Sequence, residues 1–251
     1  MAKRSFHHNG TLEQSAATEH RAPTRTLIEE AYIRLRDDII EGRLAPGEKL
    51  RIEHLKISYG VGAGTLREAI TRLSSDALVV SEGQRGFWVK PISVDDLEDL
   101  TKLRMHIESD ALRQSVRISD PQWRERVRMA YEQMAAFEQP IMPALRKQWE
   151  ALNLQFHEAL VSGCNSAWTQ HVLRLLSRQS ERYRRLAIDL PNQARDVHAE
   201  HAMIFEAAMS GAEARAALAL EMHLRATPDL IARAYREGLI PLFSKLPEKT
   251  Y

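Results

Sequence analysis

The hydrophobic residues of this chain repeat with a helical period over almost its whole length, and one short stretch departs from that period. From Leu27 to Ile39 they recur at every fourth position, so they lie on one side of a helix. Val79-Val80 and residues 87–89 instead form short apolar runs on either side of a glycine-containing turn, which is the pattern of a β-hairpin. These patterns predict a mostly α-helical protein with one small hairpin.

The composition also favours helices. Only 11 glycines and 10 prolines occur in 251 residues, whereas β-sandwiches and barrels need many turns. Hydrophobic residues make up 44% of the chain and charged residues 27%, which is ordinary for a globular protein and excludes disorder of the whole chain. The length suits one large domain or two modest ones.

Charge and cysteine content narrow the partners and the compartment. The 35 Lys and Arg residues nearly balance the 34 Asp and Glu residues, so a nucleic-acid contact must come from a local basic patch. No apolar run approaches the roughly 18 residues of a membrane helix, and no apolar segment typical of a secretory signal follows the N-terminus. The single cysteine, Cys164, cannot form an internal disulfide. We therefore expect a cytoplasmic protein without a membrane partner.

The order of the predicted elements divides the chain into two domains. The predicted helices span residues 25–41, 52–59, 63–76, 94–117, 121–138, 143–162, 166–188, 194–210 and 212–237. Three helices followed by the hairpin predict a winged helix-turn-helix over residues 25–92, with the hairpin as its wing. The remaining helices predict an antiparallel bundle of six helices over residues 93–240. Residues 1–24 and 241–251 are expected to be tails.

Two stretches of the first domain resemble motifs of GntR-type bacterial transcription factors. Residues 39–50, IIEGRLAPGEKL, are similar to the signature I-x-x-G-x-L-x-P-G-x-x-L of that family. Residues 59–70, YGVGAGTLREAI, together with Arg72-Leu73, are similar to its recognition-helix motif, and residues 83–89 resemble its wing. The match covers residues 25–92 without a gap, and it implies that double-stranded operator DNA is the partner.

The resemblance and the geometry of groove binding together indicate the residues that contact DNA. The candidates are Arg51, Thr65, Arg67, Arg72, Arg85 and Gly86. Arg67 lies about one turn into the third helix, where a guanidinium reaches guanine or a phosphate in the major groove. Arg85 and Gly86 lie at the wing tip, where the arginine can enter the minor groove. Arg51 precedes the second helix, where it can hold a phosphate.

Three positions depart from the family pattern. Many members carry a polar trio such as Ser-Arg-Thr where this chain has Gly62, Ala63 and Gly64. Base recognition is therefore expected to depend more on Thr65, Arg67 and the wing. A winged-helix module that binds protein instead of DNA remains an alternative, because backbone contacts alone specify little sequence.

Three histidines of the second domain lie on or beside apolar helix faces. His157, His201 and His223 belong to three different predicted helices, and Asn153 precedes His157 by four positions, on the same face. All four side chains are expected to point into the bundle. Buried imidazoles that converge on one point indicate a metal site. Core histidines that are satisfied by hydrogen bonds, without a metal, are the alternative.

This arrangement resembles the FCD effector domain of the FadR subfamily. The motif there is D-x-x-x-H on one helix, a histidine on a later helix and another histidine 22 positions further on. Residues 153–157, NLQFH, match the first part with Asn in place of Asp, and His201 and His223 are 22 positions apart. The resemblance covers residues 94–240 and implies that Asn153 and the three histidines bind a divalent ion of the Zn, Ni or Mn class. Because Asn lacks the negative charge of Asp, we expect weaker metal affinity and a site more open to an anion.

The same resemblance implies that a small organic acid binds near the metal as an effector. Arg104 matches the R-x-x-x-E position of the family and can form a bidentate pair with a carboxylate. An intrahelical pair with Glu108 is the alternative use of this arginine. Arg182, Tyr183 and Arg185 are further candidates for the edge of the effector pocket.

These observations predict a homodimeric transcriptional regulator, and in the family it resembles such a regulator is most often a repressor. The two DNA-binding domains of a symmetric dimer would bind a near-palindromic operator. No catalytic residue and no organic cofactor are expected, so the chain is not expected to be an enzyme. A metal-dependent hydrolase remains an alternative, since a metal held by histidines can activate water. However, no acid or base is clearly placed beside these histidines.

Overall fold

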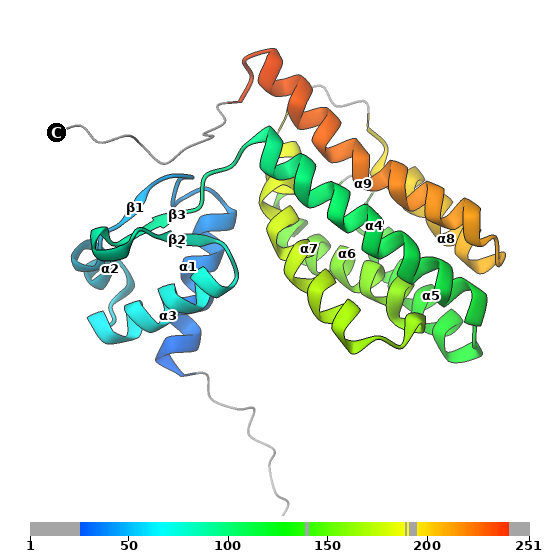
Figure 1. Ribbon diagram of the computed structural model, residues 1–251, viewed down its shortest axis with the longest axis horizontal. Coiled ribbons are helices and arrows are strands. Elements are labelled where there is room, and N and C mark those ends of the chain that lie inside the picture. Colours follow the sequence, from blue (N-terminus) through cyan, green and yellow to red (C-terminus); the bar gives the residue numbers. More distant parts are fainter. Residues whose placement is uncertain (1–25, 139–140, 189, 191–194, 241–251) are drawn as a thin grey trace, which may run out of the picture.

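The computed structural model describes residues 26–138, 141–188, 190 and 195–240, which form two domains (Figure 1). The two predicted tails, residues 1–24 and 241–251, lie outside the described residues. The first domain contains α1 (Leu27–Ile40), β1 (Lys49–Leu50), α2 (Ile52–Tyr59), α3 (Ala63–Ser75), β2 (Val79–Ser81), the 3-10 turn η1 (Gly83–Arg85) and β3 (Phe87–Val89). This is the predicted winged helix-turn-helix.

The wing has one strand more than the sequence predicted. In the described part of the chain, the strands form an antiparallel sheet with the order β1-β3-β2, in which Leu50 pairs with Phe87 and Val80 pairs with Trp88. The strand β1 contains only Lys49 and Leu50, and two residues are too few to show a period of two. Only its pairing with β3 makes it a strand.

The core of the first domain forms where the helices face one another. Leu35 of α1, Leu66 and Ile70 of α3, and Leu78 next to β2 are completely buried. Thr26 begins α1 as its N-cap, because its hydroxyl accepts a hydrogen bond from the Glu29 amide at 3.2 Å. This packing presents the N-terminus of α3 on the surface.

The second domain is built from helices within the described residues, as the sequence predicted. Its elements are α4 (Val94–Ile118), α5 (Pro121–Ala135), η2 (Pro143–Leu145), α6 (Arg146–Val161), η3 (Ser162–Cys164), α7 (Ala167–Ile188), α8 (Val197–Met209) and α9 (Glu213–Arg236). The long helix α4 packs most extensively against α9 and also contacts α6 and α7, while α8 packs against α9 (Figure 1). None of the described helices is long and apolar enough to cross a membrane.

Helix caps explain where several of these helices begin. The Ser93 hydroxyl accepts a hydrogen bond from the Asp96 amide at 3.1 Å, and Asp120 accepts one from the Trp123 amide at 2.9 Å, as the sequence indicated. The helix predicted over 194–210 begins at Val197, because Asp196 is its N-cap. Residue 194 itself lies outside the described residues. The helix predicted over 121–138 ends at Ala135, and Glu138 is therefore free of helical geometry.

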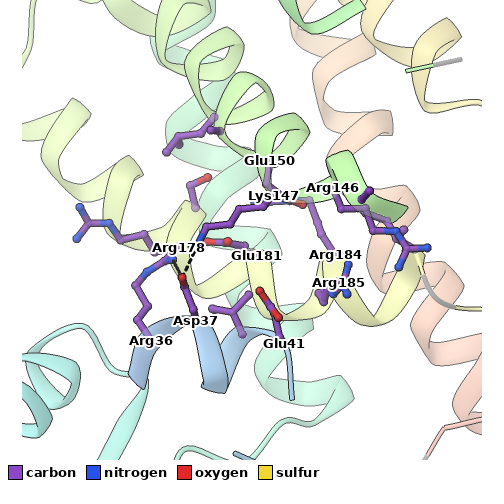
Figure 2. A pocket seen from close by; sticks show the side chains of 16 residues that line it. Arg36, Asp37, Glu41, Arg146, Lys147, Glu150, Arg178, Glu181, Arg184 and Arg185 are labelled. Carbon is purple, nitrogen blue, oxygen red and sulfur yellow. Dashed lines mark hydrogen bonds and ion pairs between the residues drawn. The ribbon is translucent and has the colours of Figure 1, made fainter. Parts of the chain in front are cut away.

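The helix α1 of the first domain contacts α7 of the bundle. Arg36 forms an ion pair with Glu181, and Asp37 forms one with Lys147 of α6. Between α1, α6 and α7 lies a cavity of about 400 Å³ (Figure 2). We call it the junction cavity.

Candidate functional site

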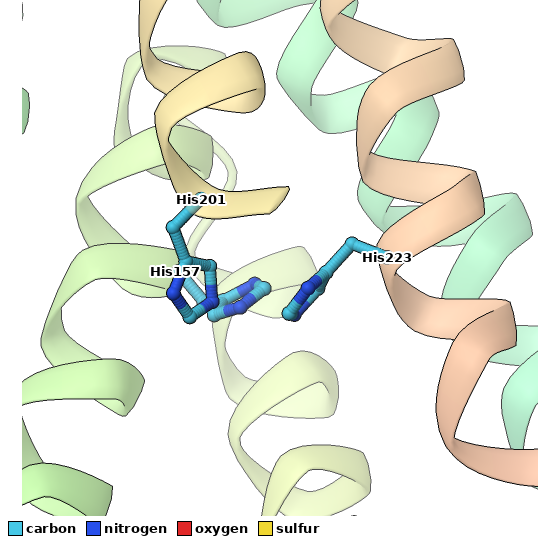
Figure 3. Close-up of side chains that lie close together, drawn as sticks. All are labelled: His157, His201 and His223. Atoms are coloured by element: carbon cyan, nitrogen blue, oxygen red, sulfur yellow. The ribbon is translucent and has the colours of Figure 1, made fainter. Parts of the chain in front are cut away.

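Three histidines from three helices converge inside the bundle (Figure 3). His157 of α6, His201 of α8 and His223 of α9 are buried, and each offers a ring nitrogen within 4.8 Å of those of the other two. The ring centroids of His201 and His223 are 4.5 Å apart, and those of His157 and His223 are 5.2 Å apart. The structure thus brings together the three histidines that the sequence singled out.

A carboxylate faces the Nδ1 atom of each histidine. His201 Nδ1 lies 2.6 Å from Glu138 Oε1, and His223 Nδ1 lies 2.8 Å from Glu200 Oε2. The third pair is looser, with 3.5 Å between His157 Nδ1 and Glu108 Oε2. A carboxylate on Nδ1 leaves Nε2 as the nitrogen that can bind a metal and fixes the orientation of the ring.

Two ring nitrogens of this cluster lack a hydrogen-bond partner among the described residues: His157 Nδ1, which lies 3.5 Å from Glu108, and His201 Nε2. His201 is 0% exposed, and its Nε2 atom has no hydrogen bond. Such a buried polar atom costs about 1–3 kcal/mol unless another group satisfies it. The free nitrogen is therefore an observation that fits a bound ion and does not fit a fully satisfied core histidine.

Burial sets the charge of these groups. It lowers the pKa of His157, and it lowers the pKa of His223 well below 6.5, so both imidazoles are neutral at neutral pH. Burial alone would raise the pKa of the Glu108 carboxyl, but its interactions with Arg104 and His157 together outweigh burial and hold the pKa at about 2. Neutral imidazole is the form that binds a metal.

The donor set fits a divalent ion that prefers nitrogen ligands. Imidazoles suit zinc, nickel, copper and iron, whereas calcium and magnesium prefer oxygen ligands. Asn153 is buried and lines the same small cavity as His157 and His223. Its amide oxygen is the neutral donor that the sequence offers in place of a carboxylate.

The cavity beside the histidines, here called the histidine cavity, is small and polar. Its volume is about 20 Å³, and it is lined by Leu97, Thr101, Arg104, Asn153, His157, Ser180, Arg184, His223, Leu224 and Thr227. A neighbouring cavity of about 310 Å³ shares Arg104 and His157 with it and is lined in part by Leu154, Val161 and Leu173. The small cavity has room for one carboxylate group, and the larger one has room for an apolar body.

The structure separates the four residues that the sequence gave as effector contacts. Arg104 lines the histidine cavity, and its Nε also donates to Glu108 at 2.7 Å, so the intrahelical pair is formed as well. Arg182 instead donates to the Lys90 carbonyl at 2.5 Å. Tyr183 donates to Asp96 at 2.7 Å. Neither of these two lines the cavity, and Arg185 lines the junction cavity.

Arg184 is the residue of this stretch that reaches the histidine cavity, and sequence reasoning missed it. It lies four positions after Ser180, which lines the same cavity, so a helical period from Ser180 would have indicated it. Glu138 and Glu200 were also missed. Glu200 lies next to His201 in sequence, but Glu138 follows the end of α5 and carries no signal of its contact with His201.

The predicted DNA-contacting residues of α3 point in two directions. Thr65 and Arg67 lie near the N-terminus of α3, and the exposed side chain of Arg67 forms no hydrogen bond or ion pair with the described residues. Arg72 is turned back toward α1, because it donates to Glu29 at 2.7 Å and lies over the Tyr32 ring at 4.3 Å. Its distance from the helix N-terminus and these contacts leave it less available to DNA than Arg67.

The wing presents its predicted residues to solvent. The Arg85 side chain is 58% exposed, and Gly86 has φ 110° and ψ −149°, a backbone conformation that is essentially restricted to glycine. Arg51 is exposed at the start of α2. Lys49, which the sequence did not single out, lies with its Nζ atom 4.9 Å from the centre of the Trp88 ring and adds a positive charge beside the wing.

Comparison with known proteins identifies both domains. Residues 27–89 match the bacterial regulatory proteins of the gntR family, and residues 99–226 match the FCD domain. The chain belongs to the GntR family of transcriptional regulators. It is 44% identical over 213 residues to the HTH-type transcriptional regulator BphR of Paraburkholderia xenovorans (strain LB400), which covers 84% of this chain and 87% of that one.

Other relatives of this GntR-family regulator are more distant. The HTH-type transcriptional repressor GlaR of Escherichia coli (strain K12) is 27% identical over 210 residues, which covers 82% of this chain and 96% of GlaR. A GntR transcriptional regulator from Rhodococcus sp. RHA1 shares the fold with a TM-score of 0.66 at 24% identity, covering 83% of this chain and 99% of that structure. Regulators of this family bind DNA operators and typically act as dimers, and FCD domains often bind metal ions.

Proposed function

We propose that the chain is a homodimeric repressor of the FadR subfamily, that it acts in the cytoplasm, and that a small carboxylate controls its affinity for a near-palindromic operator. The observation that carries the proposal is the histidine cavity, in which two arginines and several hydroxyl groups surround a space the size of one carboxylate. The exposed Arg67 at the start of α3 supports the DNA-binding part.

In this proposal, His157, His201 and His223 would hold a divalent ion of the Zn, Ni or Mn class, and Asn153 would add an amide oxygen. The ion would supply a positive charge that attracts the carboxylate. Arg104 lies on the wall of the same cavity and would orient the carboxylate through charge-assisted hydrogen bonds. The apolar side chains of the neighbouring cavity would contact the body of the acid.

The effector changes DNA binding only if it binds one arrangement of the two domains better than another. The histidine cavity lies in the bundle, whereas Thr65, Arg67 and the wing lie in the first domain. A dimer binds two half-sites about one helical turn apart, so a small change in domain placement alters the fit to both. Carboxylates do lie beside the histidines, but the relatives are transcriptional regulators, which favours regulation over the alternative of a hydrolase.

Fluorescence anisotropy with DNA from upstream of the gene tests this function. Near about 0.15 M salt and with excess nonspecific competitor, we expect saturable binding that Arg67→Ala weakens by about 1–3 kcal/mol. Arg72→Ala is the matched control, because Arg72 is held by Glu29 and should weaken specific binding less. Saturating carboxylates should change the operator affinity of the wild type. Loss of all binding in competitor, or identical affinity with every acid, would contradict the proposal.

A further inference from the structure

One side chain connects the histidine cavity to the junction between the two domains. Arg184 lines both the histidine cavity and the junction cavity, and none of the other described residues lines both. It lies on α7, close to the face that α1 contacts (Figure 2). A group bound in the histidine cavity therefore lies beside Arg184, and Arg184 in turn shares the junction cavity with residues of α1 in the DNA-binding domain.

At the wall of the histidine cavity, the Arg184 guanidinium is paired with one carboxylate of the described residues, that of Glu150. Its Nη2 donates to Glu150 Oε2 at 2.8 Å, and its Nε lies 3.2 Å from both carboxylate oxygens. Each of these side chains is only 13% exposed. A charge buried to this extent needs its partner, so Glu150 depends on Arg184 for its compensation.

Two ion pairs join α1 to the bundle, and each uses a bundle residue one helical turn away from Glu150 or Arg184. Lys147 lies three residues before Glu150 on α6 and pairs with Asp37 of α1. Glu181 lies three residues before Arg184 on α7 and pairs with Arg36 of α1. Two of the ion pairs between α1 and the bundle thus lie one helical turn from Glu150 and Arg184. Arg178 and Gln179 of α7 hold the first domain independently, through Asp76.

We propose that Arg184 is the switch residue through which an anion in the histidine cavity loosens the hold of the bundle on α1. The anion draws the Arg184 guanidinium from Glu150 into the cavity, where Thr101, Ser180 and Thr227 supply further polar contacts. Glu150 has then lost its Arg184 partner, and Lys147, one helical turn before it on α6, lines the same junction cavity. Lys147 turns from Asp37 to Glu150, so an ion pair between domains is exchanged for one within α6.

The charges balance in both states. Before the anion binds, Arg184 compensates Glu150 and Lys147 compensates Asp37. Afterwards, Arg184 compensates the anion and Lys147 compensates Glu150, while Asp37 keeps Arg36 at 3.7 Å. Since no charge is left buried and alone, the two states can be close in free energy, which a switch requires.

This inference rests on the proposed carboxylate site, so its test measures binding and response separately. Acetate, a carboxylate small enough for the histidine cavity, is the probe and is titrated calorimetrically into the full-length protein loaded with zinc. Spin labels on Ile57→Cys of α2 and Met129→Cys of α5, both exposed, report the distance between the domains in a Cys164→Ser background. In the wild type we expect acetate to bind and the distance distribution to shift.

Two variants interrupt this exchange of ion pairs from Arg184 through Glu150 to Lys147, here called the relay, without removing the histidine cavity. In Lys147→Gln we expect acetate to bind within about threefold of the wild-type affinity, because the lysine side chain is 73% exposed and its pair contributes little. In Glu150→Gln we expect acetate to bind at least as tightly as to the wild type, because no carboxylate competes with it for Arg184. In both variants the distance should no longer shift. Lys102→Gln, an exposed lysine on α4, is the matched control and should respond like the wild type. Arg184→Gln should lose acetate affinity. The double variant Arg184→Gln/Glu150→Gln leaves no uncompensated charge and covers the case in which the single variant fails to fold.

The possible outcomes separate the two proposals. A wild-type protein that does not bind acetate would contradict the carboxylate site, and the relay with it. Acetate binding without a shift in distance would overturn the relay and leave the site intact. A shift that persists in Glu150→Gln and Lys147→Gln would also overturn the relay, because the response would then take another route.

Discussion

At the scale of single residues, the histidine cluster depends on carboxylates that sequence reasoning did not include. Glu138 and Glu200 each accept a hydrogen bond from an Nδ1 atom, and this fixes which nitrogen faces the centre of the cluster. His201 is the most constrained of the three, because it is completely buried and its Nε2 atom has no partner among the residues the structure describes. Measured metal affinity of variants can distinguish a histidine that binds the metal from a carboxylate that orients it.

Removing His201 should abolish most of the metal affinity, whereas removing its orienting carboxylate should weaken it less. We expect Glu138→Gln to lower zinc affinity by about 10–100-fold, the usual effect of losing such a partner, and His201→Ala to lower it further. Calorimetric titration of chelator-treated protein with zinc measures both. His106→Ala, an exposed histidine on α4, should bind like the wild type. Unchanged affinity in His201→Ala would exclude this residue as a ligand.

At the scale of elements, two glycines of the first domain differ in whether their backbone conformation excludes other residues. Gly86 at the end of the wing turn has a conformation that other residues rarely adopt. Gly64 lies in the first turn of α3, and a Cβ atom added there would meet nothing within 4 Å. The backbone conformation requires glycine at Gly86, whereas glycine at Gly64 only lowers the stability of the helix.

Alanine substitutions at these positions should therefore act in opposite directions. Gly86→Ala should lower the free energy of unfolding by about 1–3 kcal/mol, because the backbone strain must be accepted or the wing must rearrange. Gly64→Ala should raise it by about 0.4–1 kcal/mol, because the unfolded chain loses freedom. Urea denaturation followed by circular dichroism measures both. If Gly86→Ala proved as stable as Gly64→Ala, the assigned wing conformation would be wrong.

At the scale of the whole molecule, the junction between the domains contains a hydrogen-bonded group that titrates. The Asp96 carboxylate accepts hydrogen bonds from Lys90 at 2.8 Å and from Tyr183 at 2.7 Å, and so joins the linker and α4 to α7. Burial alone would raise the pKa of Asp96, but these two hydrogen bonds hold it below 3.8. Arg182 adds a hydrogen bond to the Lys90 carbonyl.

Because the pKa of Asp96 is lowered by folding, its contribution to stability is present above pH 3.8 and is lost as the pH falls through the lowered pKa. Asp96→Asn should lower the free energy of unfolding at neutral pH by about 0.5–1.5 kcal/mol. The difference between wild type and variant should shrink below about pH 4. Urea titrations from pH 3 to 7 measure it. Asp95→Asn, exposed in the same helical turn, should show no such dependence, and an equal loss there would refute the role of Asp96.

The sequence by itself determined the elements and the order in which they occur. Apolar spacing and caps such as Ser93 and Asp120 are local, so the helices and the hairpin could be predicted with small errors at helix ends. Periodicity also predicted that His157, His201 and His223 point inward, because the faces of their helices are read from neighbouring positions.

Only the tertiary structure decided which groups meet. Glu138 contacts His201 across 63 positions, and Lys49-Leu50 is a strand only because β3 lies beside it. The choice of Arg184 over Arg182 for the histidine cavity depends on the rotation of α7 against α6 and α9, and a run of arginines does not reveal that rotation. Local patterns fix conformation through neighbours in the chain, whereas contacts between distant residues depend on packing of the whole fold.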